Sequence, residues 1–180
     1  MTGTALLVMD VQEANVARFP DPGYLPRLRG VIAAARAGGL PVISVMVGFR
    51  PGFPEVSPRN KIFGGIAARA GSGSNEIHPD VAPLDGDVVV TKRRVSAFAG
   101  SDLDVVLRAG EIDHLILTGI ATSGVVLSTL RQAADLDFRL TVVGDCCLDN
   151  DPEVHRVLVE KVFPRQADVT TSALFAQGLD

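Results

Sequence analysis

An aspartate and a lysine each stand at the end of an apolar run that is typical of a β-strand. Asp10 closes the run ALLVMD, and Lys92 closes the run DVVVTK. If both groups are removed from water together, they form an acid–base couple whose proton can be moved near neutral pH. The same two residues could instead form a structural ion pair at the edge of a sheet. The pattern leaves both interpretations open.

Two polar residues accompany this couple. Gln12 lies two residues beyond Asp10, so in an extended chain it points the same way and its amide could orient the carboxylate or a substrate. By the same spacing Arg94 shares a face with Lys92 and could bind an anionic ligand. An arginine in solvent is the alternative interpretation for Arg94.

The stretch LILTGIATSGVV, residues 115–126, runs from an apolar segment through a glycine-bounded loop into a helix. Gly119 and Gly124 have the spacing of a phosphate-binding loop, but valines follow where such a loop has Lys and then Ser or Thr. The stretch contains no Cys, His, Lys, Asp or Glu. What remains is a set of backbone amides at a helix N-terminus, which could hold an oxyanion or a carboxylate.

The positions of the histidines and cysteines do not favour a metal site or a reactive thiol. His78, His114 and His155 form no pair four residues apart, so we expect no metal site and no cofactor. Cys146 and Cys147 are adjacent, which excludes a disulfide framework and a spaced zinc site. Both cysteines are interpreted first as small buried hydrophobic residues.

The composition is that of an ordinary globular domain. The chain has 180 residues, of which 47% are apolar and 21% charged, so one domain over residues 1–180 is expected. A net charge of -4, with no Lys/Arg run longer than the three residues 92–94, argues against a nucleic-acid partner. The start of the chain has no basic leader, and no apolar run approaches the roughly 20 residues of a membrane helix. We therefore expect a cytoplasmic protein without a membrane partner.

The elements that position these residues alternate between strands and helices. Further apolar runs occupy residues 41–47, 114–119, 139–145 and 167–171, and helical patterns occupy residues 24–39, 101–110, 125–137, 151–163 and 172–178. Near-continuous Val, Ile and Leu is typical of strands covered on both faces. This order predicts an α/β fold of three layers, α/β/α, with a mostly parallel six-stranded Rossmann-like sheet and helices on both of its faces.

Local signals mark some helix ends and one irregular segment. Ser101 with Asp104 has the pattern of a capping box, and Asp151 before a proline is expected to cap the next helix. Residues 48–86 are rich in proline, with a weak helical pattern near 62–70 and a GSGSNE turn at 71–76. A loop of that length is usually functional, so a lid or a subunit contact is expected there.

Four segments, taken in order, resemble the isochorismatase-like hydrolases, a family that includes cysteine hydrolases such as nicotinamidases and N-carbamoyl amidases. They are LLVMDVQ (6–12), VVVTKRRVSAF (88–98), LILTGIATSGVVLSTLRQAAD (115–135) and LTVVGDCCLD (140–149). The resemblance covers nearly the whole chain. It implies the isochorismatase-like fold, a small-molecule substrate, and a homodimer or homotetramer.

The resemblance also implies roles for individual residues. Asp10 matches the catalytic aspartate of the family and Lys92 its catalytic lysine. The amides of Ala121 and Val125 match the oxyanion hole, and the peptide bond before Ala121 is expected to be cis. The nucleophilic cysteine of the family falls at the position of Val125. The further substrate-binding candidates are Thr122, Gln12 and Phe98.

A valine cannot attack a carbonyl carbon, so the departure at Val125 leaves three hypotheses. The first is a hydrolase of a vinyl ether, amide or ester that uses Asp/Lys acid–base chemistry, as isochorismatases cleave a vinyl ether without a cysteine. The second is a catalytically inactive small-molecule-binding or assembly member of the fold. In the third, Cys146, Cys147 or Ser123 replaces the missing thiol as the nucleophile. The metal ligands of nicotinamidases are also absent, because residues 50–58 contain no His.

Overall fold

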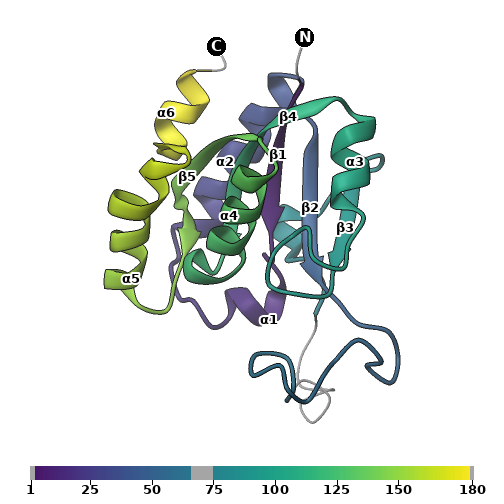
Figure 1. Ribbon diagram of the computed structural model, residues 1–180. Helices are drawn as coiled ribbons and strands as arrows, with labels where there is room; N and C mark the ends of the chain where they lie inside the picture. Colours follow the sequence, from purple (N-terminus) through teal and green to yellow (C-terminus); the bar gives the residue numbers. More distant parts are fainter. Residues whose placement is uncertain (1–2, 66–74, 179–180) are drawn as a thin grey trace.

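Six parallel strands form one sheet in the order β3-β2-β1-β4-β5-β6 (Figure 1). The computed structural model describes residues 3–65 and 75–178. The strand order reverses between β1 and β4, which is where ligands bind in open α/β sheets. The predicted six-stranded α/β sheet is therefore confirmed, with every pair of neighbouring strands parallel. The strands are β1 (Gly3–Met9), β2 (Val42–Val47), β3 (Val88–Lys92), β4 (Ile112–Ile120), β5 (Arg139–Leu148) and β6 (Asp168–Thr170).

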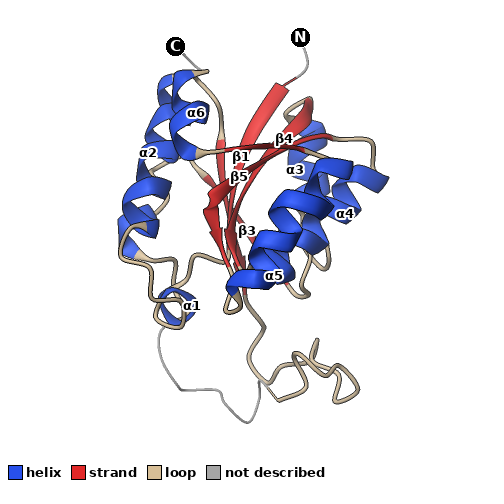
Figure 2. Ribbon diagram, turned by 90° about the vertical axis from the view of Figure 1, so that its left-hand side faces the viewer, coloured by secondary structure: helices blue, strands red, loops and turns tan. Residues whose placement is uncertain are grey.

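Helices cover both faces of the sheet and make the three predicted layers (Figure 2). Helices α2 (Tyr24–Ala37) and α6 (Ser172–Gln177) lie on one face. Helices α3 (Leu103–Ala109), α4 (Leu127–Asp135) and α5 (Pro152–Val157) lie on the other. The remaining helical pieces are α1 (Glu13–Val16), η2 (Pro79–Val81), η3 (Thr122–Val126), η4 (Leu158–Val162) and η5 (Phe163–Arg165).

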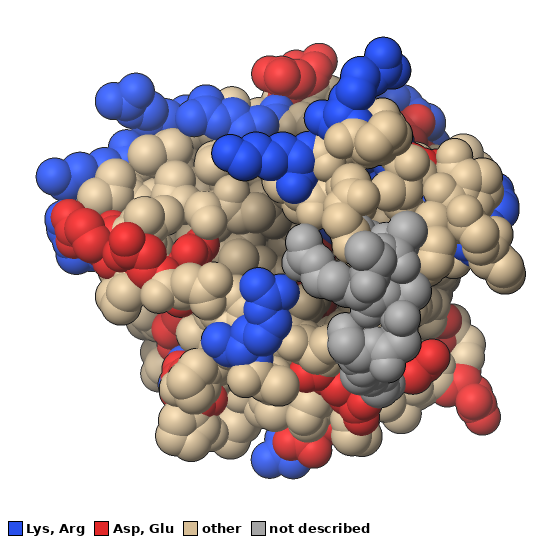
Figure 3. Space-filling view, turned by 90° about the horizontal axis from the view of Figure 1, so that it is seen from below, with Lys and Arg blue, Asp and Glu red and all other residues tan. Residues whose placement is uncertain are grey.

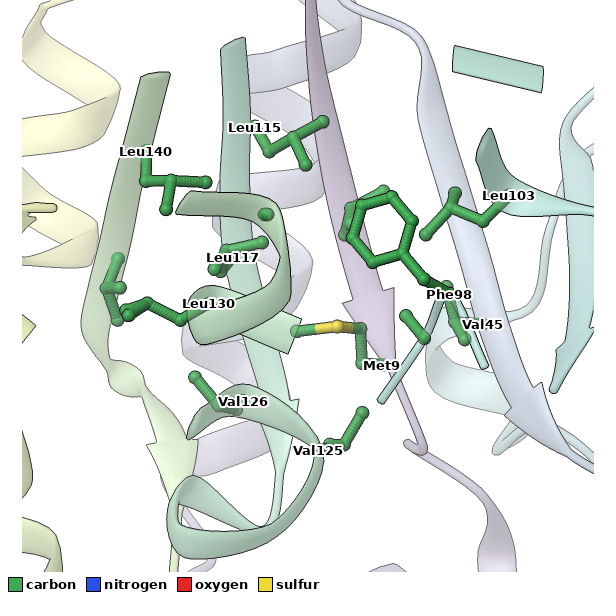
Figure 4. Packing of buried hydrophobic residues seen from close by; sticks show 14 of the residues in the cluster. Met9, Val45, Phe98, Leu103, Leu115, Leu117, Val125, Val126, Leu130 and Leu140 are labelled. Atoms are coloured by element: carbon green, nitrogen blue, oxygen red, sulfur yellow. The ribbon is translucent and has the colours of Figure 1, made fainter. Parts of the chain in front are cut away.

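Two hydrophobic cores result, one on each face, because successive strand side chains point in opposite directions. In β1, Leu7 and Met9 join the core under α3 and α4, whereas Leu6 and Val8 join the core under α2. All four side chains are at most 3% exposed. Figure 4 shows part of the first core, with Met9 beside the turn that precedes α4. Burial on both faces explains why the strands are apolar without alternation.

The expected helix caps are half confirmed. Asp151 caps α5 by accepting from the amides of Glu153 and Val154, as predicted. The capping box at Ser101 is wrong, because α3 begins at Leu103 and its N-cap residue is Asp102. The Ser101 hydroxyl donates to the carbonyl of Ala97 and accepts from the amide of Leu103. Asp104 does not return to the start of the helix; it pairs with Arg108 one turn later, at 2.8 Å.

Residues 48–65, which follow β2, lie below the carboxyl ends of β2 and β3 (Figure 1). Residues 62–65 are turns rather than the start of a helix, and 66–74, which hold the rest of that pattern and most of the GSGSNE turn, lie outside the described residues. Phe49 contacts both Phe53 and Phe63, so this segment has a small aromatic cluster of its own. None of the described helices is long and apolar enough to cross a bilayer.

Candidate active site

Asp10 and Lys92 meet at the carboxyl ends of β1 and β3. The Nζ atom of Lys92 lies 2.9 Å from Oδ2 of Asp10, although strand β2 separates the two strands that carry them. Strand register brings the ends level, because Met9 pairs with Val45 on β2 and Lys92 pairs with Val47 on the same strand. The side chains of Asp10 and Lys92 are only 11% and 2% exposed, so the ion pair is nearly closed to solvent.

Asp10 has an unusual backbone and an unusual carboxyl group. Its φ of 56° lies in the left-handed region, and the side-chain amide of Asn15 fixes this corner by donating to the Asp10 carbonyl. Burial raises the pKa of Asp10 to about 6, and the charge and hydrogen bond of Lys92 offset only part of that effect. Lys92 holds Oδ2, whereas Oδ1 is buried and has no hydrogen-bond partner among the described residues. The group can therefore carry a proton near neutral pH.

Gln12 does not reach the Asp10 carboxylate. The chain is not extended at Asp10, so the spacing on which that prediction relied does not apply. Gln12 is fully buried, and its amide instead exchanges hydrogen bonds with the backbone of Val47 and donates to the carbonyl of Asn75. It joins the end of β2 to the segment that returns from the long loop. A substrate contact of Gln12 stays a prediction.

Arg94 is neither extended from β3 nor free in solvent. Strand β3 ends at Lys92, and the half-buried guanidinium of Arg94 donates to the carbonyls of Arg93 and Glu55. Its own carbonyl accepts a hydrogen bond from Nζ of Lys92 at 2.9 Å. The interpretation of Arg94 as a solvated residue is therefore wrong.

The loop after β4 is a single wide turn, η3. The peptide bond between Ile120 and Ala121 is cis, as the resemblance implied. The amides of Gly124 and Val126 both donate to the carbonyl of Ala121. The amides assigned by resemblance to the oxyanion hole, those of Ala121 and Val125, are not among these donors.

Gly119 brings this turn against the end of β1. Its φ is 141°, and a Cβ atom there would lie 2.2 Å from the carbonyl oxygen of Met9. Only a residue without a side chain allows this approach of β4 to β1. The start of the turn and Asp10 are therefore held at neighbouring positions, because Gly119 is also the register partner of Met9.

Val125, to which the resemblance assigns the position of the family cysteine, lies in the hydrophobic core. It is 2% exposed and belongs to the same cluster as Met9, Val45 and Phe98 (Figure 4). Phe98 is itself 9% exposed, and its ring lies 6.0 Å from that of Phe138. Val125 and Phe98 thus form apolar structure beside the end of β1, and a contact of either with a substrate stays a prediction.

Thr122 is turned away toward α5. Its hydroxyl lies 2.8 Å from Nδ1 of His155, and the neighbouring amide of Ser123 donates to the Asp149 carboxylate. Burial lowers the pKa of His155, so a neutral imidazole makes this contact near pH 7. Sequence reasoning missed His155 and Asp149, because no spacing in the chain links residues 149–155 to the turn. Together they attach η3 to the start of α5.

The alternative nucleophiles are poorly placed. Burial raises the pKa of the Cys146 thiol to about 12 and that of Cys147 even further above its usual range, so both are protonated at neutral pH. They also point to opposite faces of β5, into different cores. The Ser123 side chain is exposed rather than directed at the buried pair. Across residues 3–65 and 75–178 no group of three His, Cys, Asp or Glu side chains is arranged to hold a metal ion.

Residues 4–173 match the isochorismatase domain. A ureidoacrylate amidohydrolase from Caulobacter vibrioides is 34% identical over 178 residues, which cover 83% of this chain and 79% of that protein. An isochorismatase family protein from Burkholderia thailandensis has a similar structure, with a TM-score of 0.82, 28% identity, and coverage of 98% and 95% of the two chains. N-carbamoylsarcosine amidase from Thermoplasma acidophilum has a TM-score of 0.75 and 28% identity, over 95% of this chain and 97% of that one.

Proposed function

The chain belongs to the isochorismatase family, and we propose that it is a hydrolase that uses Asp10 and Lys92 as an acid–base pair without a thiol nucleophile. The buried pair supports this proposal most directly, since one carboxyl oxygen is held by Lys92 and the other has no partner in the part of the chain that the structure describes. Val125 supports the second half, because a valine has no lone pair with which to form an acyl-enzyme. The substrate is a small molecule with a vinyl ether, ester or amide bond.

A vinyl ether suits this pair best. Protonated Asp10 transfers its proton to the terminal vinyl carbon, which leaves an oxocarbenium ion on the substrate and a carboxylate at Asp10. Lys92 stabilises that carboxylate. Water then adds to the cation and returns a proton to Asp10, and the hemiketal collapses to a carbonyl compound and an alcohol. Water is the only co-reactant, and the pair ends in its starting state.

An ester or amide is the broader possibility within the same proposal. The Asp10 carboxylate would then take a proton from water as it attacks the carbonyl carbon. The amides of Ala121 and Val125 would hold the oxyanion, as the resemblance implies. The relatives named as amidohydrolase and amidase favour testing this bond class.

Turnover of a substrate panel tests the proposal. We expect the purified protein to hydrolyse at least one of isochorismate, ureidoacrylate and N-carbamoylsarcosine, with products separated by chromatography. Pretreatment with iodoacetamide serves as the control and should leave the rate within about twofold, because the only two cysteines are buried and protonated at neutral pH. A rate abolished by alkylation would contradict the thiol-free mechanism.

A binding or assembly protein is the second candidate, favoured by the loss of the nucleophile at Val125. A buried charge pair that serves no chemistry seldom stabilises a fold, which argues against this candidate. No turnover across the panel, combined with a ligand-induced rise in melting temperature that Asp10→Ala and Lys92→Ala remove, would favour it over the hydrolase.

Activity should depend on the protonated form of Asp10. With a pKa of about 6, about a tenth of the molecules carry the proton at pH 7. For vinyl ether cleavage we expect kcat/KM to be flat below pH 6 and to fall tenfold per unit above it. A pH–rate profile under constant ionic strength measures this; a rate that rises with pH instead would assign Asp10 the role of a base.

The same pKa predicts how stability varies with pH. Because the folded pKa exceeds the unfolded value of 3.8, the contribution of Asp10 to stability is greatest below about pH 4 and is lost as pH rises through about 6. Urea unfolding of the Asp10→Asn variant across this range is the control, and it should lack this component.

Two expectations from the sequence are also proposals. We propose a homodimer or homotetramer, which light scattering of the purified protein tests. We propose a cytoplasmic location, which the two free, buried cysteines support because a reducing compartment keeps thiols in that form.

A further inference from the structure

We propose that Arg94 binds a carboxylate group of the substrate and thereby selects anionic substrates; this inference rests on the proposed function. Figure 3 shows the face formed by the carboxyl ends of the strands, where Lys and Arg side chains stand around a hollow. A cavity of about 480 Å³ is lined by Arg50, Glu55, Arg93, Arg94 and Gly100.

The cavity carries an excess of positive charge. Three guanidinium groups face one carboxylate, that of Glu55. Burial works to raise the pKa of Glu55, but hydrogen bonds from its own backbone and from Arg50 outweigh it and hold that pKa below its usual range, so Glu55 is ionised. The lining therefore has two more positive than negative charges at neutral pH.

Glu55 pairs with two of the three arginines. Its Oε1 lies 2.5 Å from Arg50 and 3.4 Å from Nε of Arg93. The Arg94 guanidinium donates to two backbone carbonyls, those of Arg93 and Glu55. Within residues 3–65 and 75–178, no carboxylate pairs with the Arg94 guanidinium. Arg94 is thus the member of the cavity whose charge is left for a ligand.

Arg94 connects the cavity to the reacting pair. Its guanidinium lines the cavity, while its carbonyl accepts the hydrogen bond of Lys92 Nζ at 2.9 Å. The same Nζ atom holds Oδ2 of Asp10. Among the described residues, the cavity lining does not include Asp10 or Lys92, and the Arg94 backbone is what links it to Lys92. The proposal is that a substrate held by its carboxylate at Arg94 extends from the cavity to the pair.

A carboxylate fits these donors better than a neutral group does. A guanidinium is planar and presents paired N–H donors that match the two oxygens of a carboxylate. It is also half-buried here, so the interaction is less screened than at the surface. Two carbonyl acceptors hold the side chain in place before any ligand binds.

Direct binding tests this assignment without requiring turnover. Benzoate and benzamide have the same shape but differ in charge, and calorimetry at fixed ionic strength measures their affinities. We expect the wild-type protein to bind benzoate at least tenfold more tightly than benzamide. Arg94→Gln should lose about 10- to 100-fold in benzoate affinity, and Arg94→Lys should lose less because it keeps the charge.

Arg59→Gln is the matched control. Arg59 is an exposed arginine of the same irregular segment, so the substitution makes the same change in net charge away from the cavity. It should leave benzoate affinity within twofold. Thermal melting of each variant confirms that it is folded, and Arg94→Lys keeps the test usable if Arg94→Gln is not.

The possible outcomes separate the two proposals. Benzoate binding that is absent or independent of Arg94 would overturn the role of Arg94, even if the substrate panel shows turnover. Binding that depends on Arg94 with no turnover would support that role and overturn only the hydrolase proposal. Inorganic phosphate is the second probe: binding at Arg94 at least as tight as that of benzoate would indicate a free-anion site and overturn the substrate assignment.

Discussion

Turnover by the Asp10→Asn variant should fall by about 10²- to 10⁴-fold, the usual contribution of a positioned proton donor. Asparagine cannot supply the proton that the carboxyl group, with its pKa of about 6, provides. It also tolerates the left-handed backbone of residue 10, where φ is 56°. The loss should therefore appear in kcat under saturating substrate while circular dichroism shows an unchanged fold.

Removal of one partner from a buried ion pair can itself destabilise a protein, so a second variant is needed. Asp10→Asn with Lys92→Met removes both charges from the pair. We expect this double variant to be at least as stable as Asp10→Asn alone and equally inactive. Turnover above a tenth of the wild-type rate in either variant would refute the assignment of Asp10 as the proton donor.

The Gly119→Ala variant should be destabilised by about 2–6 kcal/mol, which combines backbone strain with an overlap that cannot relax. The added Cβ would lie 2.2 Å from the carbonyl oxygen of Met9, a backbone atom in the centre of the sheet. The φ of 141° is also one that alanine rarely adopts. Urea unfolding followed by circular dichroism measures the change in the free energy of unfolding.

Gly30→Ala is the matched control for Gly119→Ala. Gly30 is an exposed residue inside α2, and a Cβ there would have no atom within 4 Å. Alanine is favoured over glycine in a helix interior, so we expect a gain of about 0.5–1 kcal/mol. A Gly119→Ala variant as stable as the wild-type protein would show that β4 can move away from β1 without cost.

The fold was predictable because strands that are buried on both faces of the sheet have a nearly continuous apolar sequence. Runs such as ALLVMD and HLILTG consist mostly of apolar residues, and each lies within a strand of the sheet or at its end. Helix ends were less predictable. Helix α3 begins at Leu103 rather than after Ser101, and the hydrogen bond from Ser101 to Ala97 is one that the sequence pattern does not predict.

The site was predictable only where strand ends determine it. Asp10 and Lys92 could be placed together because the ends of parallel strands meet at one edge of a sheet. Gln12 could not, because the left-handed turn at Asp10 is rare for a residue other than glycine. The contact of Thr122 with His155 and the meeting of Arg94 with Glu55 join segments that are far apart in the chain. Such contacts follow from tertiary packing alone.

The position of β1 between β2 and β4 also determines when the protein can be completed during synthesis. Strands β1, β2 and β3 leave the ribosome first and supply both charges of the reacting pair, since Asp10 and Lys92 precede β4. Until residues 112–120 emerge, the other edge of β1 has no partner. In the folded protein β4 covers that apolar edge, and the register of Gly119 with Met9 brings the turn of Val125 next to the end of β1.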